Sequence, residues 1–429
     1  MDIEAIGRRP VRISVGRLID ATTDDVVEVP SAILVVDGRI EAIGPEARVP
    51  RPNGARDFQY PTATALPGLI DGHVHVTLPP TVDPLATLDA ETDEQLVARG
   101  AVAAERMVRA GVTTAVDLGA RGTTGFRVRE VVERGISLGP RLLVAGRPVT
   151  PTGGHCHFFG GQADGAEGVQ AAIRGLIEDE GADIIKMIAT GGGLTAGTDS
   201  RHAAYETDVL RAAADEAHRL GRRITAHAHG VPGIRRATEA GVDSIQHCTM
   251  LGPNWEWTFD AAVAGLMAER GTRAVPTISA GTRFEVEAGI DINKLQPNPG
   301  AMTRADSWAN ARNLHEAGVT IVPGTDVGVN LTDFGEELFF ELEAYVGWGL
   351  SPIATIRKAT AVAAWNLGLD DVTGTLGPGL DADVLVVDSE PDRDISALRR
   401  PLLVLRRGRP IQPTPPPPAP TRRVAAASA

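Results

Sequence analysis

The sequence has little cysteine, few aromatic residues and no long apolar run. Two cysteines in 429 residues, Cys156 and Cys248, cannot build a disulfide framework, and this usage is typical of a reducing compartment. No apolar stretch approaches the roughly 18 residues that cross a bilayer, and the start MDIEAIGRRP lacks the apolar core of a secretory signal. A net charge of −13 argues against nucleic acid or an anionic membrane as a partner. We therefore expect a cytoplasmic protein.

Both ends of the chain are predicted to form short strands. The segment VVDGRIEAIG carries Asp-Gly between two apolar stretches, which indicates a hairpin. Similar apolar segments, such as ADVLVVD and PLLVLRRGRP, recur near the other end. We expect residues 1–64 and 367–410 to form one small β-sandwich domain. The remaining 411–429 are rich in proline and then alanine, which favours an extended or disordered tail.

The centre, residues 65–366, alternates predicted strands with amphipathic helical stretches. This alternation is typical of a parallel barrel. The eight strand candidates are 66–76, 112–117, 141–145, 182–188, 223–227, 242–247, 273–277 and 319–324. The sequence thus predicts an α/β protein: a distorted (β/α)8 TIM barrel with a β-sandwich domain built from both termini.

Eight of the ten histidines stand at predicted strand ends or in the loops that follow them, where such barrels carry their chemistry. They are His73, His75, His155, His157, His202, His227, His229 and His247. Side chains at i and i+2 of a strand share a face, so the HVH segment can direct two imidazoles at one object. Metal ligation explains the set of His73, His75, His227 and His247, because neutral imidazole binds zinc and similar metals. Asp326, in VPGTDVG, either adds a carboxylate or only caps a helix.

Lys186 stands in the apolar strand ADIIKMIAT, where an unpaired ammonium carries a large desolvation cost. Three interpretations remain open. The side chain reaches outward to solvent, it is a low-pKa amine for Schiff-base chemistry, or CO₂ converts it to a carbamate. The carbamate suits neighbouring histidines, since it supplies an anionic pair of oxygens that bridges two metals.

The motifs PGLIDGHVH, ADIIKM, AHAHG, GVDSIQH, PGTD and LGPGLDADVLVVD together resemble the metal-dependent amidohydrolase superfamily. The resemblance extends from about residue 10 to about residue 410. It is strongest to the branch of imidazolonepropionase-like enzymes, prolidases and arginine carboxypeptidases, and ochratoxin-hydrolysing amidases. It implies a hydrolase of amide or peptide carbon–nitrogen bonds.

The resemblance also implies a ligand set for two divalent metal ions. His73, His75 and Asp326 look like ligands of the more buried ion, and His227 and His247 like ligands of the second. Lys186 looks like a carbamylated bridge between the two ions. His227 is preferred to His229 because it precedes His247 by twenty positions. Zinc is the expected metal, and manganese, iron or cobalt suit the same ligands.

In the mechanism that this resemblance implies, a metal-bridging hydroxide attacks the amide carbonyl. Asp326 accepts the proton and passes it to the departing nitrogen. His155 or His229 can donate a hydrogen bond to the developing oxyanion. These three residues are the candidate catalytic groups.

Three loops offer candidate substrate contacts. Segment 151–161 contains His157, and the glycine-rich 190–205 contains Arg201, His202 and Tyr205. This second loop is long and glycine-rich, which makes it a candidate lid. It lacks the Gly-Lys-Ser/Thr ending of a phosphate loop, which argues against phosphate binding. Arg201 can pair with a substrate carboxylate, while Tyr205 either reaches a substrate carbonyl or caps a helix. Trp255, in 252–259, either forms an apolar wall or makes a subunit contact.

The substrate class stays open between two hydrolase hypotheses. The first is a peptide or C-terminal amide, with removal of a follower peptide from a bottromycin-like modified ribosomal peptide as one specific case. The second is a cyclic amide, an N-acyl amino acid or a xenobiotic amide. A third hypothesis is a non-catalytic barrel relative, and retention of all six expected metal positions argues against it. We also expect a homo-oligomer.

Overall fold

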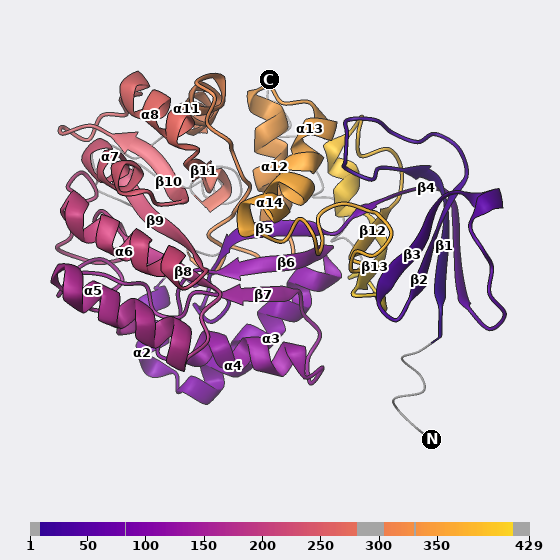
Figure 1. Cartoon of the computed structure of the whole chain (residues 1–429), viewed down its shortest axis with the longest axis horizontal. Helices are drawn as coiled ribbons and strands as arrows, with labels where there is room; N and C mark the ends of the chain where they lie inside the picture. Colours follow the sequence, from indigo (N-terminus) through magenta and orange to yellow (C-terminus); the bar gives the residue numbers. More distant parts are fainter. Residues whose placement is uncertain (1–8, 82, 281–303, 330–331, 415–429) are drawn as a thin grey trace, which may run out of the picture.

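The computed structural model describes residues 9–81, 83–280, 304–329 and 332–414. Strands from both ends of the chain form one seven-stranded sheet, in the order β14-β13-β12-β4-β1-β2-β3. Its strands are β1 (Val11–Leu18), β2 (Ser31–Val36), β3 (Arg39–Pro45), β4 (Arg56–Pro67), β12 (Val384–Val387), β13 (Pro401–Arg406) and β14 (Arg409–Ile411). Figure 1 shows the indigo N-terminal strands beside the yellow C-terminal ones. The ends thus share a sheet, as the sequence predicts, although the described strands form one sheet and not a sandwich of two.

Seven further strands form two parallel sheets in the centre of the chain, with the orders β5-β6-β7 and β11-β10-β9-β8. They are β5 (Leu69–Val74), β6 (Val112–Asp117), β7 (Arg141–Val144), β8 (Ile184–Ile188), β9 (Arg223–Gly230), β10 (Ser244–Leu251) and β11 (Arg273–Val275). All residues of these strands are buried except Arg141, Arg223, His229 and Thr249, which are partly buried. Such burial is typical of parallel strands covered on both faces.

Isolated parallel bridges connect the two sheets at both of their edges. Val149 pairs with Met187 beside β8, and Val74 at the end of β5 pairs with Val327. The predicted eighth strand, 319–324, contributes a single bridge between Ala274 and Ile321. The described residues therefore contain seven strands of the predicted barrel, and no named eighth strand closes it. The backbone of 319–327 instead makes two hydrogen bonds with Ala274 on one side and several with residues 72–75 on the other.

Helices follow most of the central strands and lie around them in Figure 1. They are α2 (Pro84–Ala90), α3 (Asp93–Arg109), α4 (Thr124–Glu133), α5 (Gly165–Arg174), α6 (Thr207–Arg219), α7 (Val231–Ala240), α8 (Ala261–Arg270), α11 (Arg304–Glu316), α12 (Glu337–Trp348), α13 (Pro352–Arg357) and α14 (Ala363–Leu367). Short turns of other helix types are η1 (Glu46–Arg48), η2 (His157–Phe159), η3 (Gly175–Asp179), η4 (Lys358–Val362) and η5 (Ile395–Arg399).

Among the helices of the described residues, α3 is the longest and shows how local sequence fixes an element. A capping box starts it: Thr92 accepts the Gln95 backbone N–H, and the Gln95 side chain accepts that of Thr92. Its buried face joins the main hydrophobic core between helices and strands. None of the helices described is long and apolar enough to span a bilayer. Residues 415–429 of the predicted tail lie outside the described residues.

Candidate metal centre

The end of β5 and the turn near residue 326 bring three possible metal ligands together. Nε2 of His73 lies 3.3 Å from Nε2 of His75, and each of these nitrogens lies 3.2 Å from Oδ1 of Asp326. For zinc bound at about 2.0–2.1 Å, neighbouring ligands of a tetrahedron are separated by about 3.4 Å. The triangle of donor atoms thus has the size of one face of a zinc tetrahedron.

The hydrogen bonds of His75 fit a triangle that holds a cation. Its Nδ1 lies 2.9 Å from the carbonyl oxygen of Gly119, which can only accept. The proton of the neutral ring is therefore on Nδ1, and Nε2 carries a lone pair. A lone pair at 3.2 Å from the carboxylate of Asp326 is repulsive, and a metal ion bound by both groups, or a proton shared between them, removes this repulsion. Such a carbonyl partner on the far nitrogen is typical of metal-ligating histidines.

Three more histidines form a second group of possible ligands at the ends of β9 and β10. Ligand atoms of His227, His229 and His247 all lie within 4.8 Å of one another. Nε2 of His227 lies 3.1 Å from the Gly191 carbonyl oxygen and must donate, which leaves the lone pair on Nδ1. Nδ1 of His247 lies 2.8 Å from the Thr277 hydroxyl, so its Nε2 is the nitrogen available to a ligand.

Lys186 lies in β8 next to both groups and is 3% exposed. Its Nζ lies 3.5 Å from Nε2 of His73, and its charge also acts on His227 and His247. Burial lowers the pKa of Lys186 to about 8, although Asp326 works in the opposite direction. The structure therefore does not direct this amine to solvent, which was one of the three interpretations of the sequence.

Burial favours the neutral, metal-binding form of His73, His227 and His247. Desolvation, followed by the positive charge of Lys186, holds the pKa of His73 well below its usual range. Desolvation is also the largest cause that lowers the pKa of His227 and His247. Because a protonated imidazole has no lone pair, these shifts favour ligation near neutral pH.

The backbone is strained at two of the candidate ligands. His247 has a φ of 66° and Asp326 a φ of 59°, both in the left-handed region that residues other than glycine rarely adopt. His247 lies where the register between β9 and β10 shifts. Such strain is typical of functional sites, where the surrounding structure holds a side chain in a required direction.

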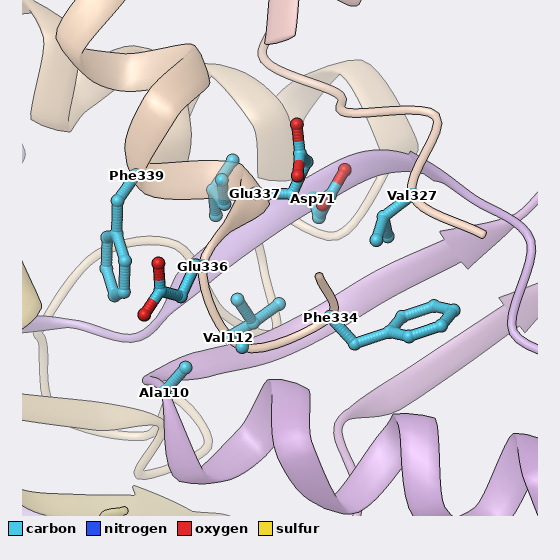
Figure 2. A pocket seen from close by; sticks show the side chains of 10 residues that line it. Asp71, Ala110, Val112, Val327, Phe334, Glu336, Glu337 and Phe339 are labelled. Atoms are coloured by element: carbon cyan, nitrogen blue, oxygen red, sulfur yellow. The ribbon is translucent and has the colours of Figure 1, made fainter. Parts of the chain in front are cut away.

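The buried carboxyl group of Asp71 forms hydrogen bonds with both segments that carry the first group of ligands. Asp71 of β5 accepts the backbone N–H groups of His73 and Thr325 and the Thr325 hydroxyl. Burial raises the pKa of Asp71 to about 7. Figure 2 shows Asp71 close to Glu337, beside Val327. Asp71 thereby ties the end of β5 to the turn that carries Asp326.

His155, the predicted catalytic residue of the loop 151–161, lies next to the histidine cluster. The ring of His155 is 4.6 Å from that of His227, and burial lowers its pKa to about 3. His157, in η2, has its Nδ1 3.1 Å from the Gly154 carbonyl oxygen. The neighbouring Phe159 stacks on His75 at 6.1 Å.

Arg201, a predicted substrate contact of the loop 190–205, makes its hydrogen bonds with other residues of the protein. Arg201 donates hydrogen bonds from Nε and Nη2 to the Asp199 carboxylate, which neutralises its charge. Its Nη1 donates to the Pro253 carbonyl oxygen. The Arg201 guanidinium also lies 4.6 Å from the Trp255 ring. To bind a substrate carboxylate, Arg201 would have to give up its hydrogen bonds with Asp199.

His202 and Tyr205 likewise have protein partners. The His202 side chain is 75% exposed and pairs with Asp199 at 2.9 Å. The Tyr205 hydroxyl is part of a largely buried side chain and donates to the Ala163 carbonyl oxygen at 2.7 Å. This bond joins the loops after β7 and β8, which is a structural role different from both interpretations of the sequence.

Sequence reasoning did not include His229 among the metal ligands. The spacing to His247 selected His227 alone, but the two histidines of AHAHG repeat the i, i+2 pattern of HVH in β5. That repeated pattern was the available signal. Threonines that contact the histidine rings carried no recognisable signal, because their positions depend on loop packing.

The family model described as "Amidohydrolase family" matches residues 64–411. The ochratoxinase of Aspergillus niger is 29% identical over 409 residues, covering 87% of this chain and 80% of that protein. An uncharacterised protein of Mycobacterium tuberculosis is 28% identical over 389 residues, covering 88% of this chain and 91% of that protein.

Solved structures of related hydrolases also resemble this chain over nearly its whole length. A Xaa-Pro dipeptidase with methionine bound in its active site superposes with a TM-score of 0.83 at 29% identity, covering 94% of this chain and 99% of that chain. The A. niger ochratoxinase structure gives 0.80 at 26% identity, covering 95% and 96%. The chain therefore belongs to the amidohydrolase family and is a hydrolase of carbon–nitrogen bonds in amides.

Proposed function

We propose that this chain is a binuclear metal-dependent hydrolase of a peptide or C-terminal amide bond. The observation that carries the proposal is the pair of donor groups, His73, His75 and Asp326 on one side and three histidines on the other. His227 and His247 are the proposed ligands of the second ion, and zinc is the proposed metal because neutral imidazoles predominate among the donors.

Lys186 is the proposed bridge between the two ions. Its amine forms a bond to the carbon of CO₂ and releases one proton, which leaves a carbamate with two oxygen donors. The reaction needs the neutral amine, and the lowered pKa of Lys186 raises the neutral fraction near pH 7. A carbamate also replaces an ammonium that lies 3.5 Å from an imidazole nitrogen with an anion that two cations attract.

The bound ions would polarise the amide carbonyl and lower the pKa of a water molecule. Asp326 then takes the proton of the attacking water and delivers it to the departing nitrogen, which makes the amine a better leaving group. His155 and His229 lie beside the ligands and are the candidates that stabilise negative charge on the carbonyl oxygen.

We propose that the two parallel sheets are one distorted (β/α)8 barrel, residues 65–366, joined by the isolated bridges. Segments 1–64 and 367–410 form the proposed second domain. The likeness to the dipeptidase structure over 94% of the chain supports this arrangement. In such barrels the carboxyl ends of the strands carry the active site, and the candidate ligands lie at those ends.

A second candidate substrate is an N-acyl amino acid or xenobiotic amide with a large apolar acyl group. An apolar cluster of Leu78, Leu88, Leu96, Cys156, Phe159, Ile188 and Val329 adjoins the first donor group through the stacking of Phe159 on His75. Phe158 and Leu194 pack against this cluster and are only partly buried. The neutralised Arg201 and the similarity to an ochratoxinase favour this candidate.

The similarity to a Xaa-Pro dipeptidase favours the first candidate. Removal of a follower peptide from a modified ribosomal peptide stays a special case of it. The two candidates differ in the group on the carbonyl side of the scissile bond, which is an amino acid or peptide in the first and a bulky apolar acyl group in the second.

A substrate screen with the metal-loaded protein tests the proposal. Dipeptides including Xaa-Pro, peptide amides and N-acyl amino acids are incubated with the protein, and the released amines are quantified. We expect hydrolysis that Asp326→Asn abolishes and that His218→Gln, a change at a partly exposed histidine of α6, leaves intact. A protein that holds two metals per chain and cleaves none of these amides contradicts the proposed function.

A further inference from the structure

A cavity of about 650 Å³ lies at the end of the central strands opposite to the candidate metal ligands. Small-molecule sites in proteins typically occupy roughly 300–1,000 Å³. The cavity opens where β7 and β9 begin, at Arg141 and Arg223. In β9, Arg223 precedes the proposed ligand His227 by four residues, which corresponds to about 13 Å along a strand. The cavity is therefore separate from the metal centre.

Arginine side chains dominate the charge of the cavity lining. Four arginines stand against two acidic residues: Arg129, Arg141, Arg222 and Arg223 against Glu133 and Asp183. Three of the arginines form ion pairs, Arg129 with Asp183, Arg141 with Asp381 and Asp383, and Arg223 with Asp243. Glu133 pairs at 2.8 Å with Arg406, which does not line the cavity. The lining acids thus leave one arginine without a counter-charge.

That arginine is Arg222. Its Nε donates to the Ala182 carbonyl oxygen at 3.0 Å, and its side chain is partly buried. Within the described parts of the chain, no acidic side chain forms an ion pair with Arg222, and its Nη1 and Nη2 have no hydrogen-bond acceptor. The bond from Nε restrains the guanidinium group, while the N–H groups on both Nη atoms stay available to a ligand.

The residues around Arg222 add to the local positive charge. Arg223 and Arg273 share the carboxylate of Asp243, at 3.2 and 3.8 Å, and His218 contacts the same carboxylate at 2.9 Å. Burial, followed by the positive charge of Arg223, lowers the pKa of Arg273. One carboxylate therefore serves two guanidinium groups, and Arg222 adds a third. This corner is positive in a chain whose net charge is −13.

The cavity also offers space and an apolar wall beside Arg222. A Cβ added at the preceding Gly221 would meet no described heavy atom within 4 Å. Leu142, Leu143 and Leu367 line the cavity and are largely buried. The exposed acidic residues 370–371 are close in sequence but do not line the cavity and form no ion pair with the described arginines of its lining.

We propose that this cavity binds a small organic anion, whose carboxylate or phosphate oxygens accept hydrogen bonds from Nη1 and Nη2 of Arg222. The planar guanidinium fork matches both kinds of oxyanion. The leucines of the wall contact the apolar part of the ligand. This site goes beyond the proposed hydrolysis and does not depend on it, because the cavity shares no residue with the metal centre.

Calorimetric titration of the zinc-loaded, full-length protein tests the site with defined probes. Phenyl phosphate and benzoate carry the two anionic groups on one apolar ring, and benzyl alcohol is the uncharged control. We expect saturable binding of an anionic probe and none of benzyl alcohol. The tighter of the two anions identifies the group that the cavity recognises. Failure of both anions to bind at millimolar concentration, or equal binding of benzyl alcohol, would overturn the inference.

Substitution of Arg222 locates the binding. Arg222→Gln should raise the Kd of the preferred anion by about 10–100-fold, as expected for loss of hydrogen bonds to a charged group. Arg222→Lys keeps the charge without the planar fork and should have an intermediate Kd. Arg211→Gln is the matched control, because Arg211 of α6 also donates only to a backbone carbonyl oxygen among its described contacts and lies outside the cavity lining. An equal Kd in Arg222→Gln and wild type would contradict the proposal.

Thermal unfolding separates binding from a loss of structure. Without a probe, Arg222→Gln and wild type should unfold at similar temperatures, since Arg222 has no acidic partner to lose. The preferred anion should raise the midpoint of wild type and Arg211→Gln by mass action, and that of Arg222→Gln much less. An equal rise in Arg222→Gln would contradict the site.

Zinc also binds oxyanions, so the titration is repeated with the metal-free chain. Binding that depends on Arg222 should persist there. Binding that disappears with the metal would place the anion at the metal centre and overturn this inference. None of these measurements uses turnover, so a chain that hydrolyses no amide refutes the proposed function and leaves the anion site standing.

Discussion

Glu341 offers a prediction whose size follows from its surroundings. This residue lies in α12 with no exposed surface, and its Oε2 accepts the backbone N–H of Ser279 at 2.7 Å. Burial raises the pKa of Glu341 to about 8, with a smaller contribution in the same direction from the charge of Asp71. The folded chain therefore keeps a proton on Glu341 at pH values where an unfolded glutamate, with a pKa of about 4.3, has lost it.

This difference makes the folded state less stable as pH rises. Below about pH 4.3 both states bind the proton, and between there and about pH 8 only the folded state does. Each pH unit in that window lowers the free energy of unfolding by about 1.4 kcal/mol for one such group. The contribution of the protonated group is thus fully present in acid and is lost as pH rises through the folded pKa.

Glu341→Gln removes the titration and keeps an acceptor for Ser279. Between about pH 5.5 and 7.5, the wild-type chain should lose about 2.7 kcal/mol more unfolding free energy than the variant. Urea unfolding of both metal-free proteins at the two pH values measures this difference. Glu269→Gln, on the exposed side of α8, is the matched control and should keep the wild-type slope. Equal slopes for Glu341→Gln and wild type would refute the reasoning.

Three further predictions concern the site. His75→Ala and His247→Ala should each lose one metal ion per chain, measured by elemental analysis after dialysis, since they belong to different donor groups; loss of both ions from either variant would show that the groups are one site. Gly192→Ala should lower turnover, because its Cβ would lie 2.4 Å from Nε2 of His155, whereas Gly193→Ala, with open space around it, should not; equal activities would contradict this view of the loop. Chelation of the metals should lower the free energy of unfolding in a denaturation series, by about 2.7 kcal/mol per site relative to protein with metal at 100 times the Kd, and an unchanged midpoint would oppose it.

The polar positions at strand ends could be predicted because they depend on strand order alone. His73, His75, Lys186 and Asp326 stand in short apolar segments whose ends a parallel arrangement brings together. The structure places their donor atoms within 3.5 Å of one another or of His73. Strand ends and the buried lysine indicated a candidate site here, and the resemblance to the amidohydrolase superfamily gave each residue its expected role.

The contacts in the loops could not be predicted, because they depend on which loops meet. Arg201 stands only two residues from Asp199, and nothing in the sequence shows that this pair closes on itself. Tyr205 contacts the loop after β7 through a hydroxyl whose partner is a backbone oxygen. The predicted strand 319–324 also depends on its neighbours. In the structure, residues 319–327 form one bridge with Ala274 and one with Val74, and these isolated bridges do not make a continuous strand.

The number of metal ions per chain tests the central claim most directly. The full-length protein is loaded with zinc in the presence of bicarbonate, dialysed, and analysed for metal and protein concentration, in parallel with Lys186→Ala. We predict two ions per wild-type chain and fewer in Lys186→Ala. A wild-type chain that retains no zinc, or a Lys186→Ala chain that retains two ions and full amide hydrolysis, would contradict the account.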